Sequence, residues 1–128
     1  MTARAWAAMG KKDWNAVEEI ANRAHRTWGE QARKTNNGLA KLPGKLEAKR
    51  YATLNELATI TFLKGEALYK KGDRDGALAA YYTLLADFNY GQCWDKAGWW
   101  WQPAKAARDR IAELSPGSQA EVSIEADP

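Results

Sequence analysis

Apolar side chains recur along most of the chain at the three- and four-residue spacing of a helix. One such series predicts a helix that ends near Trp28, and its members are Trp14, Val17, Ala21 and Ala24. A shorter helix from Thr2 precedes it, and a turn with Asp13 as N-cap separates the two. Turn-forming residues are frequent at 35–45, and a long loop or insertion is predicted over about 29–45.

The longest helix is predicted from Leu46 to Lys71, because no proline interrupts the pattern and Gly72 follows as a C-terminal cap. Two of its faces are apolar, as expected of a helix packed on both sides. Its third face has mixed polarity and consists of Asn55, Thr59, Phe62, Glu66 and Tyr69. We expect this third face to be open enough to keep Asn55 and Glu66 hydrated.

Two more helices complete the pattern, one capped by Asp73 and ending near Phe88, the other from about Ala97 to Leu114. Trp100 heads the core series of the last helix, which continues with Ala104, Ala107, Ile111 and Leu114. An all-α fold of about five helices over residues 1–114 is therefore expected, followed by an acidic, flexible, extended C-terminal tail at 115–128.

Composition supports the helical assignment and narrows the chemistry. The chain has 24 Ala and 11 Leu against 2 Val and 4 Ile, a balance that favours helices over strands. A single cysteine, Cys93, excludes an intrachain disulfide, and a buried inert thiol is favoured over a reactive one. One Cys and one His do not make a usual structural zinc site, so no metal and no cofactor are expected.

No apolar run approaches the roughly 20 residues that a membrane-spanning helix needs, so no membrane partner is expected. The start of the chain has no signal-peptide core, which indicates a cytoplasmic protein. A periplasmic location stays open if Met1 replaces a leader.

The segment from Gly65 to Tyr82 resembles a tetratricopeptide repeat. The resemblance gives Gly65 and Ala77 the small positions at which two helices approach, and Leu68 and Tyr81 the large ones beside them. Gly72–Asp73 is then the turn between the two helices of a repeat that covers roughly residues 58–91.

A weaker copy begins at Gly10, where the spacing from glycine to alanine is 6 residues instead of the 5 found from Gly72 to Ala77. An insertion must separate the two copies, and the last helix is either the first helix of a third repeat or a terminal cap. Tetratricopeptide folds bind extended peptides in a groove lined by the first helix of each repeat. The resemblance therefore implies a protein–protein interaction module or scaffold, although the Lys/Asn clamp of tail-binding members is not visible here.

No enzyme is predicted. His25 has no nearby nucleophile or carboxylate in a triad pattern, and a surface or capping role is favoured for it. The neighbouring carboxylates Glu18 and Glu19 diverge on a helix, and the chain lacks a glycine-rich phosphate loop.

The predicted partner-binding residues lie on the third face of the long helix and near the tryptophan run. They are Asn55, Thr59, Phe62, Glu66, Tyr69, Lys96, Trp99 and Trp101. Three consecutive tryptophans in a helix cannot all face a core. Trp101 is either folded back under the connector 89–95 or exposed as an interface anchor beside cations. Exposed tryptophan faces also leave glycan binding open as an alternative.

Charge is unevenly distributed along the chain. Residues 21–50 hold eight basic and two acidic side chains, which fits a solvated connector, an acidic partner or, less well, nucleic acid. The tail carries three acidic and no basic residues. Homo-oligomerisation is predicted through the tryptophan-rich end or through tail residues Val122, Ile124, Asp127 and Pro128, which are expected to dock on a neighbouring copy.

Overall fold

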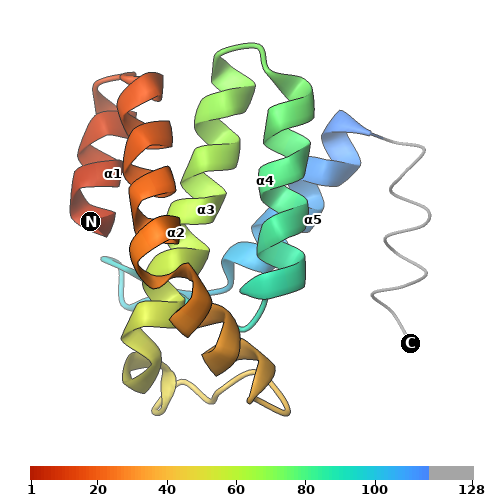
Figure 1. Ribbon diagram of the computed structural model, residues 1–128. Helices are drawn as coiled ribbons and strands as arrows, with labels where there is room; N and C mark the ends of the chain where they lie inside the picture. Colours follow the sequence, from red (N-terminus) through yellow and green to blue (C-terminus); the bar gives the residue numbers. More distant parts are fainter. Residues whose placement is uncertain (116–128) are drawn as a thin grey trace.

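The computed structural model describes residues 1–115, so the predicted tail residues Val122, Ile124, Asp127 and Pro128 lie outside the described part. Five α-helices dominate it (Figure 1): α1 (Thr2–Gly10), α2 (Trp14–Asn37), α3 (Ala52–Lys70), α4 (Arg74–Asp87) and α5 (Pro103–Leu114). A 3₁₀ turn (Ala48–Tyr51) precedes α3, and a small antiparallel hairpin of β1 (Cys93–Asp95) and β2 (Trp99–Trp101) precedes α5. The all-α class is confirmed.

Consecutive helices pack on one another in chain order (Figure 1). In addition, α1 and α5 both contact α3, and α2 contacts α4. The odd-numbered helices therefore form one layer and α2 with α4 the other, with α3 at the centre.

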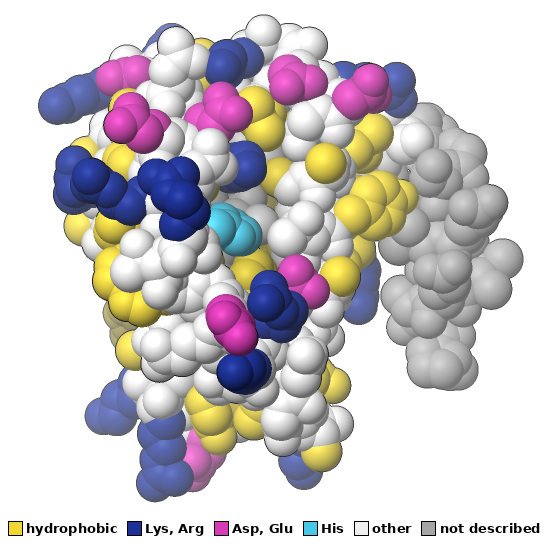
Figure 2. Space-filling model, viewed as in Figure 1, with side chains coloured by type: hydrophobic (Ala, Val, Ile, Leu, Met, Phe, Trp, Pro, Cys, Tyr) yellow, Lys and Arg dark blue, Asp and Glu magenta, His cyan; other side chains and the backbone are white. Residues whose placement is uncertain are grey.

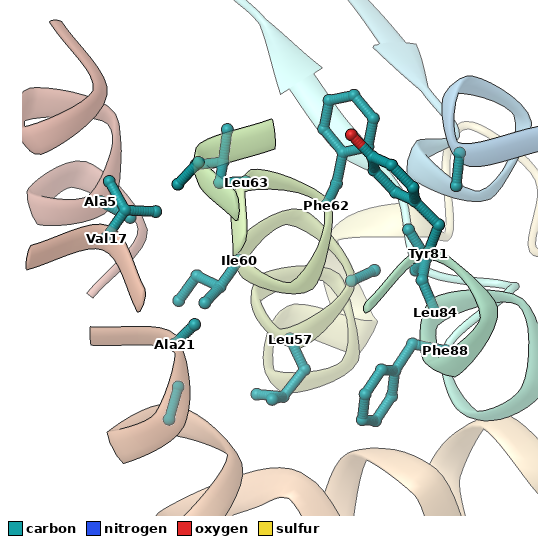
Figure 3. Close-up of a cluster of buried hydrophobic side chains, with 14 of the residues drawn as sticks. Ala5, Val17, Ala21, Leu57, Ile60, Phe62, Leu63, Tyr81, Leu84 and Phe88 are labelled. Carbon is teal, nitrogen blue, oxygen red and sulfur yellow. The ribbon is translucent and has the colours of Figure 1, made fainter. Parts of the chain in front are cut away.

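The core gathers around α3 (Figure 3). Val17 and Ala21 of α2 face Ile60 and the neighbouring leucines of α3, and all of them are less than 2% exposed. On the other side of α3 the contacts come from α4, through Tyr81, Leu84 and Phe88. The prediction that the long helix is packed on two sides is confirmed, because both of its apolar faces are covered.

The turns α1–α2 and α3–α4 have the same geometry. Lys12 (φ 59°) and Gly72 (φ 89°) occupy the left-handed position, and Asp13 and Asp73 follow as N-caps, accepting from Ala16 N at 3.2 Å and from Gly76 N at 2.9 Å. The two helical hairpins are thus related by 60 positions in sequence. This corrects the register of the weaker copy, since Lys12 and not Gly10 is the counterpart of Gly72.

The shared offset reveals a size exchange at the point where each pair of helices crosses. Gly65 of α3 lies so close to the ring of Tyr81 on α4 that no Cβ would fit between them. The corresponding positions in the first hairpin are Ala5 and Ala21, both fully buried. The glycine and tyrosine of the second hairpin thus correspond to two buried alanines in the first.

Two predicted boundaries before α3 are wrong. The loop expected at 29–45 begins only at Gly38, because α2 continues to Asn37. The last turns of α2 are held by Asn36, whose Nδ2 donates to Asn89 Oδ1 at 2.8 Å and whose Oδ1 accepts from Tyr90 N at 2.9 Å. The helix expected from Leu46 is a 3₁₀ turn at its start, and regular helix begins at Ala52.

The helix expected from Ala97 is also wrong, because the tryptophan run lies in β2 and α5 begins at Pro103. Gly98, at φ 103°, donates its N–H to the carbonyl of Asp95 at 2.9 Å and closes the hairpin turn. Aromatic residues favour strands, and proline is suited to the first turn of a helix. Trp100 therefore does not head the core series of α5.

Candidate functional site

A cleft of about 840 Å³ opens between α1, α3 and the β-hairpin. Four tryptophans line it and give it its name here, the tryptophan cleft: Trp6, Trp94, Trp100 and Trp101. Ala52, Asn55 and Thr59 of α3 lie along it as well.

The tryptophans divide into exposed and packed members. Trp94 and Trp100 are cross-strand partners whose rings meet edge to face at 5.4 Å between centroids. Trp6 is 44% exposed and Trp94 is 54% exposed, so both present ring surface to an incoming partner. Such exposed aromatic surface in a recess is typical of interface anchors.

Trp101 combines the two alternatives that the sequence leaves open. Its ring packs edge to face on Phe62 of α3, at 5.8 Å between centroids, and it is half-buried. It also lines the tryptophan cleft. Phe62 itself is 8% exposed and lies outside the cleft lining, so it supports Trp101 from behind.

The structure brings together only part of the predicted partner-binding set. Asn55, Thr59, Lys96 and Trp101 line the tryptophan cleft, whereas four others do not: Phe62, Glu66, Tyr69 and Trp99. Tyr69 (45%) and Trp99 (51%) are exposed elsewhere. Sequence reasoning missed the lining residues Trp6, Lys49, Glu56, Trp94 and Trp100. For the three tryptophans among them, the excess of tryptophan in the composition was the available indication.

Asn55 positions the cleft instead of facing solvent, so its predicted hydration is wrong. Its Nδ2 donates to Ala48 O at 2.7 Å, and its Oδ1 accepts from Gln92 N at 2.8 Å. Gln92 in turn donates through Nε2 to Pro43 O at 2.9 Å. One buried amide on α3 thus joins the 3₁₀ turn and the start of the hairpin.

Glu66 was also expected to be hydrated, and it is instead paired. Its carboxylate accepts from Arg110 Nε at 2.9 Å and Nη2 at 2.9 Å, and from the hydroxyl of Tyr81. Burial and the bond to Glu66 raise the pKa of Tyr81 well above its ordinary value. Bonding to Glu66 likewise raises the pKa of Arg110. The carboxylate therefore joins α3, α4 and α5 and is not free to bind a partner.

The charged side chains of the cleft differ in how far they are already engaged. Asp95 Oδ1 accepts from Ala97 N at 2.8 Å, and Glu56 Oε1 lies 3.1 Å from the amino group of Met1. The ammonium groups of Lys49 and Lys96 make no hydrogen bond or ion pair with any residue of the described range 1–115. The two cleft side chains that have no partner in this range are therefore both positive.

Cys93 lies where the hairpin meets α3, and it is buried. Burial raises the pKa of its thiol, which keeps it protonated and poorly nucleophilic. This agrees with the expected inert thiol.

His25 lies in a smaller hollow on the opposite layer, between α2, α3 and α4 (Figure 2). Its Nε2 is 2.8 Å from Thr61 Oγ1, whose hydroxyl donates to Leu57 O at 2.6 Å. Since that hydroxyl has one proton, Nε2 carries a hydrogen and donates to Thr61. The imidazole is half-buried, packs edge to face on Phe88 and is visible at the surface in Figure 2, and its bond to the Thr61 side chain replaces the capping role that was the other expectation.

Acidification is expected to destabilise the fold through His25. Burial, with help from Lys64, lowers its pKa from 6.5, so the unfolded chain binds the proton more readily than the folded one. Stability is full above pH 6.5 and falls as the pH drops below that value. Urea midpoints measured at about pH 7.5 and about pH 5.5 check this. The variant His25→Gln, which leaves no histidine in the chain, should lose most of the difference; an unchanged difference would contradict the assignment.

The described residues also bear on two other features, a metal site and a membrane-spanning helix. Within residues 1–115 there is no group of three or more metal-ligating side chains. No helix in that range has the length and apolarity to cross a membrane. Comparison with known proteins found no matching family model, no similar curated protein and no similar solved structure.

Proposed function

We propose that this chain is a protein–protein interaction module that binds an extended peptide segment in the tryptophan cleft. The observation that carries the proposal is a recess of about 840 Å³ with four tryptophans on its walls, two of them strongly exposed. Buried tryptophan contacts dominate the binding energy of many protein interfaces. An exposed aromatic surface of this kind is unfavourable in water, and such patches mark sites that a partner covers.

The arrangement of the helices supports the same proposal. The two helical hairpins share one turn geometry, and the cleft lies on the layer formed by α1 and α3. This is the layer that carries the groove in the tetratricopeptide repeats that the sequence resembles. The proposed groove is displaced from the predicted one, toward the hairpin and away from Glu66 and Tyr69.

Selection from a random peptide library displayed on phage tests the proposal. The wild type should enrich a shared peptide motif, and Trp94→Ala and Trp6→Ala should each weaken binding of that peptide by about tenfold or more, since central tryptophans are frequent hot spots. Tyr82→Ala is the matched control, because Tyr82 is 40% exposed on α4, outside the cleft. No enriched motif, or a motif bound equally by Trp94→Ala, would overturn the proposal.

Glycan binding is the second candidate, favoured by the open face of Trp94 beside the polar side chains of Asp95 and Lys96. Titration with a panel of oligosaccharides, followed by tryptophan fluorescence, separates the two. A saturable response that Trp94→Ala abolishes would favour a sugar ligand, and the absence of any response would exclude it.

The basic segment 21–50 is divided among α2, the following loop and the 3₁₀ turn, and two of its cations are paired, Lys34 with Glu30 and Arg50 with Glu47.

A further inference from the structure

The uncommitted charge of the tryptophan cleft points to the chemistry of its occupant. Lys49 and Lys96 line the cleft and have no partner in residues 1–115. Lys45 adds a third positive charge at the same end, because its Nζ contacts only the carbonyl of Trp100, at 3.3 Å. The two carboxylates of the cleft, Glu56 and Asp95, are already engaged. An occupant of this end should therefore combine apolar side chains for the tryptophans with carboxylates for the lysines.

One segment of the chain itself has this composition. Residues 120–128 carry Glu121, Glu125 and Asp127 and no basic residue. Val122, Ile124 and Ala126 alternate with polar positions, so an extended segment presents its apolar groups to one side.

Geometry favours a second copy as the source of this segment. α5 begins two residues after β2 and runs for 12 residues, which carries Leu114 roughly 18 Å from the hairpin. Figure 1 shows its end on the side of the molecule away from the hairpin. The five steps from Ser115 to residue 120 span at most about 18 Å when fully extended. Within one copy, residue 120 could therefore reach the hairpin only if residues 115–120 ran fully extended back along α5.

We propose that residues 120–128 of one copy bind the tryptophan cleft of a second copy, with Lys49 and Lys96 contacting the acidic residues. Reciprocal exchange closes a two-fold symmetric dimer. This inference rests on the proposed function, because the tail acts as one particular peptide ligand of the same cleft.

Sedimentation of the full chain over a range of concentrations tests the exchange. The wild type should form dimers as concentration rises. The cleft variant Lys49→Glu/Lys96→Glu and the tail variant Glu121→Lys/Glu125→Lys/Asp127→Lys should each dimerise at least about tenfold more weakly. The control Lys11→Glu/Lys70→Glu reverses two exposed lysines outside the cleft and should dimerise like the wild type.

Mixing the two charge-reversed variants gives the decisive result. A native tail then meets a native cleft, and a basic tail meets an acidic cleft, so heterodimers should form although neither variant self-associates. The proposal is overturned by a monomeric wild type, by variants that dimerise normally, or by a mixture that stays monomeric. It fails separately from the proposed function, because peptide selection with the tail variant reports whether the cleft binds any other peptide.

Discussion

Gly65→Ala is expected to destabilise the protein by about 3 kcal/mol, because it overpacks the point at which α3 and α4 cross. A Cβ added at Gly65 would overlap the ring of Tyr81, which is a fully buried side chain. Tyr81 is further held by its hydroxyl bond to Glu66. Urea denaturation at neutral pH measures the change, and the slope should stay constant if only stability changes.

A double-mutant cycle identifies Tyr81 as the cause. Tyr81→Ala alone should cost about 3–5 kcal/mol through the cavity that it leaves. In that background Gly65→Ala should cost little, because the pair then has the size of Ala5 and Ala21 in the first hairpin. Gly10→Ala is the matched control, since a Cβ at Gly10 meets nothing within 4 Å. An equal cost of Gly65→Ala in both backgrounds would show that the overlap with Tyr81 is not responsible.

Asn55→Leu is expected to cost about 2–4 kcal/mol and to disorganise the tryptophan cleft. The change keeps the number and branching of the side-chain heavy atoms but removes the bonds to Ala48 O and Gln92 N, so that the buried Gln92 N–H loses its partner. Because Gln92 directly precedes β1, the hairpin should lose one of its attachments to α3, and the contact of Trp101 with Phe62 remains. Urea denaturation measures the cost, and tryptophan emission of the folded state should shift to longer wavelength.

The variant Thr59→Val is the control for Asn55→Leu. Thr59 is one helical turn further along α3, lines the same cleft and is 2% exposed. Its hydroxyl donates to Asn55 O at 2.9 Å within the helix and lies beside the Cys93 thiol, but it bonds no backbone group of another segment. Thr59→Val should therefore cost less than about 1 kcal/mol. The positioning role of Asn55 would be refuted if both variants lost equal stability and kept the same emission.

Part of the candidate site was predictable because it lies on one regular helix. Asn55 and Thr59 share a face of α3 by spacing alone, and both reach the cleft. Spacing could not show that Asn55 is committed to backbone groups of two other segments, nor that Glu66 is paired with Arg110, 44 residues away. Those partners are selected by tertiary packing, which no local pattern records.

The tryptophans were likewise predictable only in part. Their excess in the composition indicated an unusual surface, but a helical reading of residues 99–101 placed them in the wrong element. A run of three aromatic residues has no periodicity that separates a strand from a helix. The left-handed Gly98 and the contact of Trp101 with Phe62 favour the hairpin, which brings Trp94 and Trp100 toward Trp6.

By itself, the sequence determined the all-α class, the five helices, the caps at Asp13 and Asp73 and the two-sided packing of α3. These features depend on helical periodicity and capping, which act within a few residues. Only the tertiary structure decided how far α2 extends, where the hairpin lies and which residues form the tryptophan cleft. Each of these depends on contacts between distant residues, such as Asn36 with Asn89 across 53 positions and Asn55 with Gln92 across 37, whose free energy is gained only when the chain has folded.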